Sequence, residues 1–220
     1  MPLRIQDNKC IYCDLQGGTR DHIPPRIFLD KPYPQNCTTV PACQKCNQEF
    51  GNDDEYIAYW IEFMKAVECN NGVLERKRIE AIFRYSTRLD DRIFNSLKVD
   101  NDNIPYMEFE KSRIINFFKR LAVAHFFVNK GVKTNLNNWD ILFFLAKKSQ
   151  PNTKQYEILG QHRDFNKSVF HDNISWNVIQ PNNYKYLVDK NNKCVFICIR
   201  DFLFSKACFC HNDNTCLIAD

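Results

Sequence analysis

Four cysteines near the start of the chain are spaced as metal ligands. They form two Cys-x2-Cys pairs, Cys10 with Cys13 and Cys43 with Cys46. Four thiolates can close a tetrahedral zinc site and leave no coordination position for a substrate. The chain has eleven cysteines, an odd number, and its N-terminus lacks an apolar leader, which favours metal binding over a disulfide framework. We therefore expect these cysteines to hold one structural Zn²⁺.

The segment between the two pairs is longer than the roughly 15–20 residues of a simple zinc ribbon. It contains Asp21, His22 and Asn36, and Asn47 follows directly after Cys46. Zinc does not need these polar residues once four cysteines bind it. They form a second set of candidate functional residues.

With these residues in view, the segment resembles the HNH (ββα-metal) endonucleases, in the variant whose core is bracketed by two Cys-x2-Cys pairs. The resemblance rests on Asp-His-Ile-x-Pro at residues 21–25, on an Asn fourteen residues after the His, and on an Asn directly after the second pair. It covers about forty of the 220 residues. Because several independent positions agree in order and spacing, the match is more specific than a single short motif.

The resemblance implies a fold and a set of roles. Thr19–Ile23 and Asn36–Val40 would form two strands, and a helix would begin near the second cysteine pair. Asp21 and Asn47 would hold one divalent cation, Mg²⁺ or Mn²⁺. His22 would face the scissile phosphate as the catalytic general base.

Elementary chemistry agrees with these roles. A neutral His, with an ordinary pKa near 6.5, can take a proton from water, and general base catalysis is worth about 10²–10⁴-fold. A carboxylate and a carboxamide both offer oxygen ligands, which suit Mg²⁺ or Mn²⁺. Asn36 is neutral and short, so we expect it to orient His22 or its own loop. Strand alternation places Asp21 and His22 on opposite faces unless the strand twists at its end.

Each of these residues also has a simpler interpretation. Asp21 and Asn36 are common turn residues, Asn47 is a good helix N-cap, and His22 can be an ordinary surface histidine. Some members of the family carry a further His ligand where this chain has Gly51. The remaining ligand of the cation therefore stays open among Glu49, Asp53, Asp54 and water.

The composition is typical of a globular protein, with 44% hydrophobic and 25% charged residues. The net charge of +4 and the pI of 8.4 are compatible with a polyanionic partner. They stay below the pI above about 9 that would itself indicate nucleic-acid binding. No stretch reaches the roughly 18 apolar residues of a membrane span. We expect a cytoplasmic endonuclease that cuts DNA rather than RNA, with a homodimer or a regulatory partner left open. The alternative is a zinc-stabilised nucleic-acid-binding or adaptor protein without catalysis.

Three regions follow from composition and periodicity, and together they predict the α+β class. The zinc-bound nuclease module is assigned to residues 1–55 and a helical region packed on it to residues 56–150. Apolar residues recur at helical spacing from Ile57 onward, with Asn52, Asp53 or Asp54 available as N-cap. Three further helices are predicted, over Leu74–Leu97, Lys111–Asn129 and Asn138–Lys148, with Ser86, Thr87 and Asp90 as candidate break points in the first. The one ending before Gly131 is apolar on nearly all sides and should be central, with His125 as a hydrogen-bonded core residue.

Residues 151–220 are predicted to be a mixed, β-rich region, which can also form one domain with residues 56–150. Runs of β-branched and aromatic residues predict strands over Val169–Ile179, Tyr184–Val188 and Cys194–Ile199. The dipeptide at 191–192, Asn-Asn, would join the last two as an antiparallel hairpin.

Two weaker patterns lie outside the cysteine-rich segment. Arg84, Arg88 and Arg92 are four apart, so they would align on one helix and could contact a phosphate backbone, although a solvated helix face is the simpler interpretation. The C-terminal tail offers ligands for a second zinc, which are Cys208, Cys210, His211 and Cys216, with Cys194 or Cys198 joining them.

Overall fold

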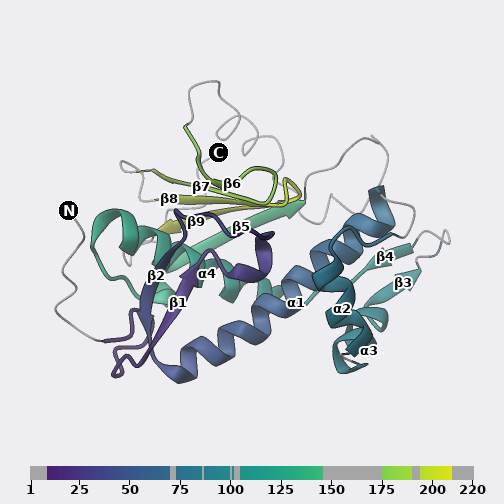
Figure 1. Cartoon of the computed structure of the whole chain (residues 1–220), viewed down its shortest axis with the longest axis horizontal. Coiled ribbons are helices and arrows are strands. Elements are labelled where there is room, and N and C mark those ends of the chain that lie inside the picture. The colour runs from purple at the N-terminus through teal and green to yellow at the C-terminus, as the bar shows by residue number, and fades with distance from the viewer. Residues whose placement is uncertain are drawn as a thin grey trace.

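The computed structural model describes residues 9–69, 73–85, 87–99, 101, 105–145, 175–189 and 194–209. Within these ranges, the side chains of residues 67–69, 83, 87–88, 90 and 105–107 are not described. In the described chain, an N-terminal hairpin is followed by a mainly helical part and then by an antiparallel C-terminal sheet (Figure 1).

An antiparallel hairpin followed by a helix forms the N-terminal part. Strand β1, Thr19–Ile23, pairs with β2, Thr38–Ala42, so that Asp21 lies opposite Val40 and His22 opposite Thr39. β-branched residues in both strands favour this extended conformation. The first strand has the predicted bounds, whereas the second begins at Thr38 instead of Asn36. The short 3-10 helix η1, Arg26–Phe28, lies between them.

Helix α1, Gln44–Cys69, is one continuous helix of 26 residues. It begins inside the second cysteine pair, as the resemblance implied. The predicted N-cap at Asn52, Asp53 or Asp54 is therefore wrong, because these residues lie within the helix. Its apolar face, including Tyr56, Ile57, Trp60 and Ile61, is buried. Figure 1 shows α1 running from the hairpin toward α2 and α3.

The predicted helix Leu74–Leu97 is two shorter helices. They are α2, Lys77–Tyr85, and α3, Thr87–Phe94. The boundary between them falls at Ser86-Thr87 in the sequence. The side chains of Ser and Thr compete for backbone hydrogen bonds, so these residue types weaken a helix. A small hairpin of β3, Leu97–Val99, and β4, Pro105–Met107, follows, which the periodicity did not predict.

Helix α4, Lys111–Lys130, is the central element, as predicted. It ends at Gly131, whose φ of 68° is the left-handed conformation that a glycine adopts at least cost. Its buried residues lie on nearly all sides, because the helix contacts both β1 and the C-terminal sheet. No helix among the described residues has the length and apolar character needed to cross a bilayer.

The C-terminal sheet has five antiparallel strands in the order β5-β9-β8-β7-β6. Its strands are β5, Trp139–Leu145; β6, Asn177–Gln180; β7, Tyr184–Asp189; β8, Cys194–Ile199; and β9, Leu203–Phe209. The predicted strands at β7 and β8 and their antiparallel pairing are confirmed. The predicted turn at 191–192 and most of the predicted strand Val169–Ile179 lie outside the described residues.

The predicted helix Asn138–Lys148 is wrong, because this segment contains β5. A short apolar run cannot be assigned to helix or strand by periodicity alone, and its partner decides. Here β9 supplies the partner, and the rings of Phe144 and Phe204 stack across the two strands with centroids 5.2 Å apart. The predicted helical region 56–150 therefore also contains strands β3, β4 and β5.

Candidate functional site

The four cysteine sulfurs of the two pairs converge on one point. The Sγ atoms of Cys10, Cys13, Cys43 and Cys46 all lie within 4.8 Å of one another. A zinc ion with Zn–S bonds of about 2.3 Å would place tetrahedral sulfurs roughly 3.8 Å apart, so the cluster fits such an ion. Four thiolates this close repel one another, and a cation is what lets all four stay deprotonated.

Local backbone contacts build this cluster. In the first pair, the backbone N–H of Cys10 donates to Leu15 O at 2.8 Å, and Asp14 takes a left-handed conformation with φ 63°. The N–H of Ile11 donates to Pro41 O, which ties this turn to β2. The second pair lies at the start of α1, where the backbone N–H of Cys46 donates to Cys43 Sγ and lowers the pKa of that thiol to about 7. A metal here joins the N-terminal turn to the helix.

Asp21 lies on the inner face of β1, where its carboxylate has fixed partners. Its Oδ2 atom accepts a hydrogen bond of 2.7 Å from the Tyr12 hydroxyl and lies 4.0 Å from Nε of Arg120. Burial, followed by the charge of Asp21, raises the pKa of Tyr12, so the hydroxyl stays protonated and donates. Asp21 is therefore more than a turn residue.

Arg120 and Asp54 complete this buried cluster. The Arg120 guanidinium is fully buried and contacts Asp54 through two nitrogens, at 2.6 and 3.1 Å. Burial raises the pKa of Asp54 to about 7, but the two contacts with the guanidinium favour its carboxylate form. Two buried carboxyl groups, those of Asp21 and Asp54, therefore share one guanidinium.

Asn47 reaches the same face of β1 as Asp21. Its Nδ2 donates to Thr19 Oγ1 at 3.2 Å, and Thr19 and Asp21 are two residues apart in the strand, so both point to one face. The N-cap interpretation of Asn47 is wrong, because its backbone N–H already donates to Cys43 O within the first turn of α1. Asp21 Oδ1 and Asn47 Oδ1 have no hydrogen-bond partner among the described residues.

Carboxylate and carboxamide oxygens are the ligand type that Mg²⁺ and Mn²⁺ prefer, and a cation at these two residues stays a prediction. The other candidate ligands differ in their availability. Asp53 forms an ion pair of 2.7 Å with Arg113, and Asp54 is held by Arg120. Glu49 is exposed on α1.

His22 lies on the opposite, outer face of β1, as strand alternation predicts. The residue is half-buried, and its imidazole has no hydrogen-bond partner among the described residues. Burial lowers its pKa, the nearby charge of Arg26 lowers it further, and Asp21 partly opposes this. Arg20 shares this face and is held by Thr39, with Nε 2.6 Å from the Thr39 hydroxyl. A neutral imidazole therefore lies among cations on an open face.

Asn36 lies away from the other candidates, in the loop that joins η1 to β2. Its Nδ2 donates to Val178 O of β6 at 3.4 Å, and the residue is exposed. Within the described part of the chain, this hydrogen bond holds its loop against the C-terminal sheet. Of the two roles predicted for Asn36, positioning of its loop fits this contact.

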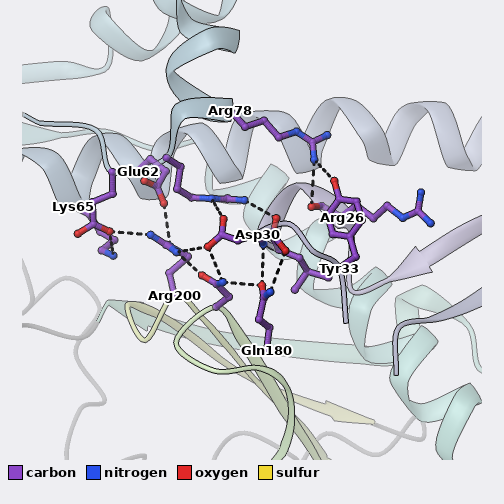
Figure 2. A network of polar contacts seen from close by, with 12 residues as sticks. Arg26, Asp30, Tyr33, Glu62, Lys65, Arg78, Gln180 and Arg200 are labelled. Atoms are coloured by element: carbon purple, nitrogen blue, oxygen red, sulfur yellow. Dashed lines mark hydrogen bonds and ion pairs between the residues drawn. The ribbon is translucent and has the colours of Figure 1, made fainter. Parts of the chain in front are cut away.

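A polar network that the sequence did not predict joins the same loop to the sheet (Figure 2). Asp30 accepts from Nε of Arg76 at 3.0 Å and from Nδ2 of Asn183 at 2.9 Å, and it lies 3.7 Å from Arg200. Burial alone would raise the pKa of Asp30, but these partners hold it below its ordinary value. Arg200 in turn pairs with Glu62 and Glu75. The charged run Glu-Arg-Lys-Arg at residues 75–78 is the sequence feature that could have pointed to this polar network.

The weaker sequence patterns have the following outcomes. Arg84 and Arg92 lie on different helices and pair with Glu80 at 2.6 Å and Glu110 at 2.5 Å, while the side chain of Arg88 is outside the described residues. Their alignment on one helix is therefore wrong. Nucleic-acid binding by these arginines remains a prediction.

The second-zinc residues are only partly described. Cys208 in β9 is buried opposite Cys194 of β8, and Cys198 of β8 is buried as well. Cys210, His211 and Cys216 lie outside the described residues, within which the Cys10–Cys46 cluster is the one group that could hold a metal. The prediction for His125 is confirmed, because it is buried and its Nε2 lies 2.7 Å from the Tyr184 hydroxyl.

Comparison of the chain with models of protein families, with curated proteins and with solved structures found no match.

Proposed function

We propose that this protein is a zinc-stabilised, metal-dependent endonuclease that hydrolyses phosphodiester bonds in DNA. The observation that supports this most is the state of His22. Its imidazole is half-buried, lacks a hydrogen-bond partner among the described residues, and has a lowered pKa beside Arg26. It is therefore neutral at physiological pH and has a free nitrogen on a face where cations can hold a phosphate.

In this reaction, His22 takes a proton from a water molecule as the water oxygen attacks phosphorus. The phosphorus–oxygen bond on the opposite side breaks, and the 3′ oxygen leaves. Arg20 and Arg26 supply positive charge near the phosphoryl oxygens on the outer face of the hairpin. Asp21 and Asn47 would hold a divalent cation on the other face of β1, and this cation would neutralise charge and stabilise the leaving oxygen where a twist at the strand end brings the two faces together.

The buried cluster supports the role of Asp21 in a specific way. The Tyr12 hydroxyl holds one carboxylate oxygen, Oδ2, and this fixes the direction of the other, Oδ1. A ligand oriented by a neighbouring hydrogen bond is a common feature of metal sites. Tyr12 and Arg120 are therefore assigned as positioning residues.

A plasmid-nicking assay with Mg²⁺ or Mn²⁺ tests the proposal. His22→Ala, compared with the parent protein at equal zinc content, should lower the nicking rate by about 10²–10⁴-fold. Gln48→Ala, exposed on α1 next to Asn47, is the matched control and should cut at the parent rate. A folded, zinc-loaded parent that cuts neither DNA nor RNA with any divalent cation would exclude the nuclease.

One observation favours the alternative of a nucleic-acid-binding or adaptor protein without catalysis. Asp21 contacts Tyr12 and Arg120 as a purely structural carboxylate would. In that case the nicking assay shows no activity. Asn47→Ala then leaves Mn²⁺ binding unchanged and affects nucleic-acid binding only where it lowers the stability of the fold. Isothermal titration of the zinc-loaded protein with Mn²⁺, for the parent and for Asn47→Ala, separates the two possibilities.

A further inference from the structure

A cavity of about 930 Å³ lies beside the polar network of Figure 2. Its lining comes from the loop after η1, from the start of α2, and from Arg200 between β8 and β9. Five of the nine lining residues are Lys or Arg and two are acidic. Cavities that take small molecules or single nucleotides measure about 300–1,000 Å³, so this one is large enough for a nucleotide.

The basic residues of the cavity divide into two groups. Arg76 and Arg200 are neutralised, because they pair with Asp30, Glu62 and Glu75. Lys31, Lys77 and Arg78 have no acidic partner among the described residues, and all three are exposed. The first group holds the wall of the cavity in place, and the second leaves positive charge for an anion.

An aromatic ring lies among these cations. Tyr33 lines the cavity, and its hydroxyl accepts a hydrogen bond of 2.8 Å from Arg78. Single-stranded nucleic acids are commonly held by aromatic rings set beside basic side chains. A cavity of this size admits one unpaired nucleotide but not a base pair with its flanking duplex.

Arg26 connects the cavity lining to the proposed catalytic residue His22. The Arg26 guanidinium lies over the Tyr33 ring, 5.3 Å from its centroid, and the Arg26 carbonyl accepts from Arg78 at 3.5 Å. The charge of Arg26 also lowers the pKa of His22. Arg26 therefore contacts the cavity lining and is close enough to His22 for its charge to act on the imidazole. Figure 2 shows Arg26, Tyr33 and Arg78 together on one side of Asp30, with Arg200 on the other.

We propose that this cavity binds an unpaired nucleotide of the substrate strand next to the phosphate at His22, with Lys31, Lys77 and Arg78 on its phosphates. The proposal rests on the nuclease function for the identity of the strand. Nucleic-acid binding by Arg84, Arg88 and Arg92 remains a separate prediction.

The test measures binding separately from cleavage. A fluorescein-labelled single-stranded DNA oligonucleotide is titrated with His22→Ala protein, with and without the added pair Lys31→Ala/Lys77→Ala, at several salt concentrations. Loss of two phosphate contacts should weaken binding and make the slope of log K against log salt shallower by about 1.4 for a single strand. Lys98→Ala, an exposed lysine on β3 outside the cavity lining, is the control and should leave the slope unchanged.

Each outcome decides the proposal. The proposal is wrong if the pair variant and the control have the same oligonucleotide affinity and the same salt slope. It is also wrong if the pair variant loses as much affinity for a blunt duplex as for the single strand. Deoxyadenosine monophosphate should compete with the oligonucleotide. Suppose that deoxyadenosine monophosphate binds the parent but the pair variant keeps the full affinity for the oligonucleotide. The cavity then binds a free nucleotide and not the substrate strand, and the proposal is wrong.

The cleavage assay on the parent protein keeps the two proposals apart. Cleavage by the parent together with unchanged binding by the pair variant overturns the cavity assignment and leaves the nuclease function standing. Weaker binding by the pair variant together with an inactive parent supports the cavity as a nucleic-acid site and removes the catalytic function.

Discussion

The hairpin module, which we define as residues 9–54, and the C-terminal sheet, β5 to β9, are stabilised by different interactions. The hairpin module is held by four clustered cysteines and by a buried cluster of Asp21, Asp54 and Arg120. In the sheet, all six residues of β8 are buried. Its cysteines at 194, 198 and 208 lie in an apolar layer with Phe144, Phe196 and Phe204.

This difference explains where the candidate chemistry lies. A short segment rich in Pro, Gly and Asn buries little apolar surface by itself, and its apolar residues, such as Ile23 and Phe28, join the core shared with the helices. A metal at the four cysteines would stabilise it further, together with the paired charges. The same composition leaves polar side chains such as His22 and Asn47 near the surface. In the sheet, cysteine serves as a small apolar residue. The same residue type thus has two roles, which depend on its surroundings.

Removal of the metal should give the largest difference in stability between the hairpin module and the C-terminal sheet. Structural zinc contributes roughly 10–16 kcal/mol in zinc-finger peptides, so a chelator should unfold the hairpin module while the sheet stays folded. Hydrogen exchange measures this through the amides of β1 and β2 against those of β8. Cys198→Ala is the control, because this sheet cysteine should not change the zinc content. Amides of β1 that stay protected after complete zinc loss would contradict the comparison.

Arg120→Met should give the next largest effect. It leaves Asp21 and Asp54 buried without their counter-charge, and breaking a buried ion pair in this way costs about 3–5 kcal/mol. Urea unfolding measures the loss. Lys119→Met, the neighbouring and half-buried residue on α4, should change the free energy of unfolding by less than about 0.5 kcal/mol. Equal effects of the two substitutions would show that the cluster does not stabilise the hairpin module.

Tyr12→Phe tests the hydrogen bond to Asp21 alone. The ring can keep its edge-to-face contact with Phe50, at 4.8 Å between centroids, while a buried acceptor loses its donor. The expected cost is about 1–3 kcal/mol in thermal or urea unfolding. Tyr85→Phe, at a residue that is 87% exposed, is the matched control and should be neutral. A neutral Tyr12→Phe would mean that the carboxylate is held by Arg120 only.

Mild acid should act on the packing of α4 against the sheet through His125. Burial lowers the pKa of His125 to about 3, whereas in the unfolded chain the pKa is near 6.5. Between these values only the unfolded chain binds the proton, so stability falls as the pH falls. The expected loss is about 1.2 kcal/mol on going from about pH 6 to about pH 5.

A comparison with His125→Gln isolates this contribution from that of other groups. Gln can still bond the Tyr184 hydroxyl but does not titrate, so the difference in unfolding free energy between parent and variant should shrink as the pH falls. A difference that stays constant over this range would exclude His125 as the source.

Short-range patterns predicted some of these features. The two Cys-x2-Cys pairs, strand β1, helix α4 with its Gly131 end, and strand β8 all follow from local spacing or from continuous apolar runs. The end of α2 next to Ser86-Thr87 also agrees with a local pattern, because these residues were the expected break points. The strand β5 did not follow from local spacing, because its local preference is weak and its neighbour in space, β9, decides the element.

By itself, the sequence determined the two cysteine pairs that cluster as a metal site, and it predicted chemistry at Asp21, His22 and Asn47 near them. Only the tertiary structure decided that Asp21 faces Tyr12 and Arg120 inside while His22 faces out, and that Lys31 and Lys77 line one cavity. The physical reason is distance along the chain. Spacing reports neighbours within a turn or a strand, whereas the partners of a buried charge are brought together only by the packing of elements far apart in sequence.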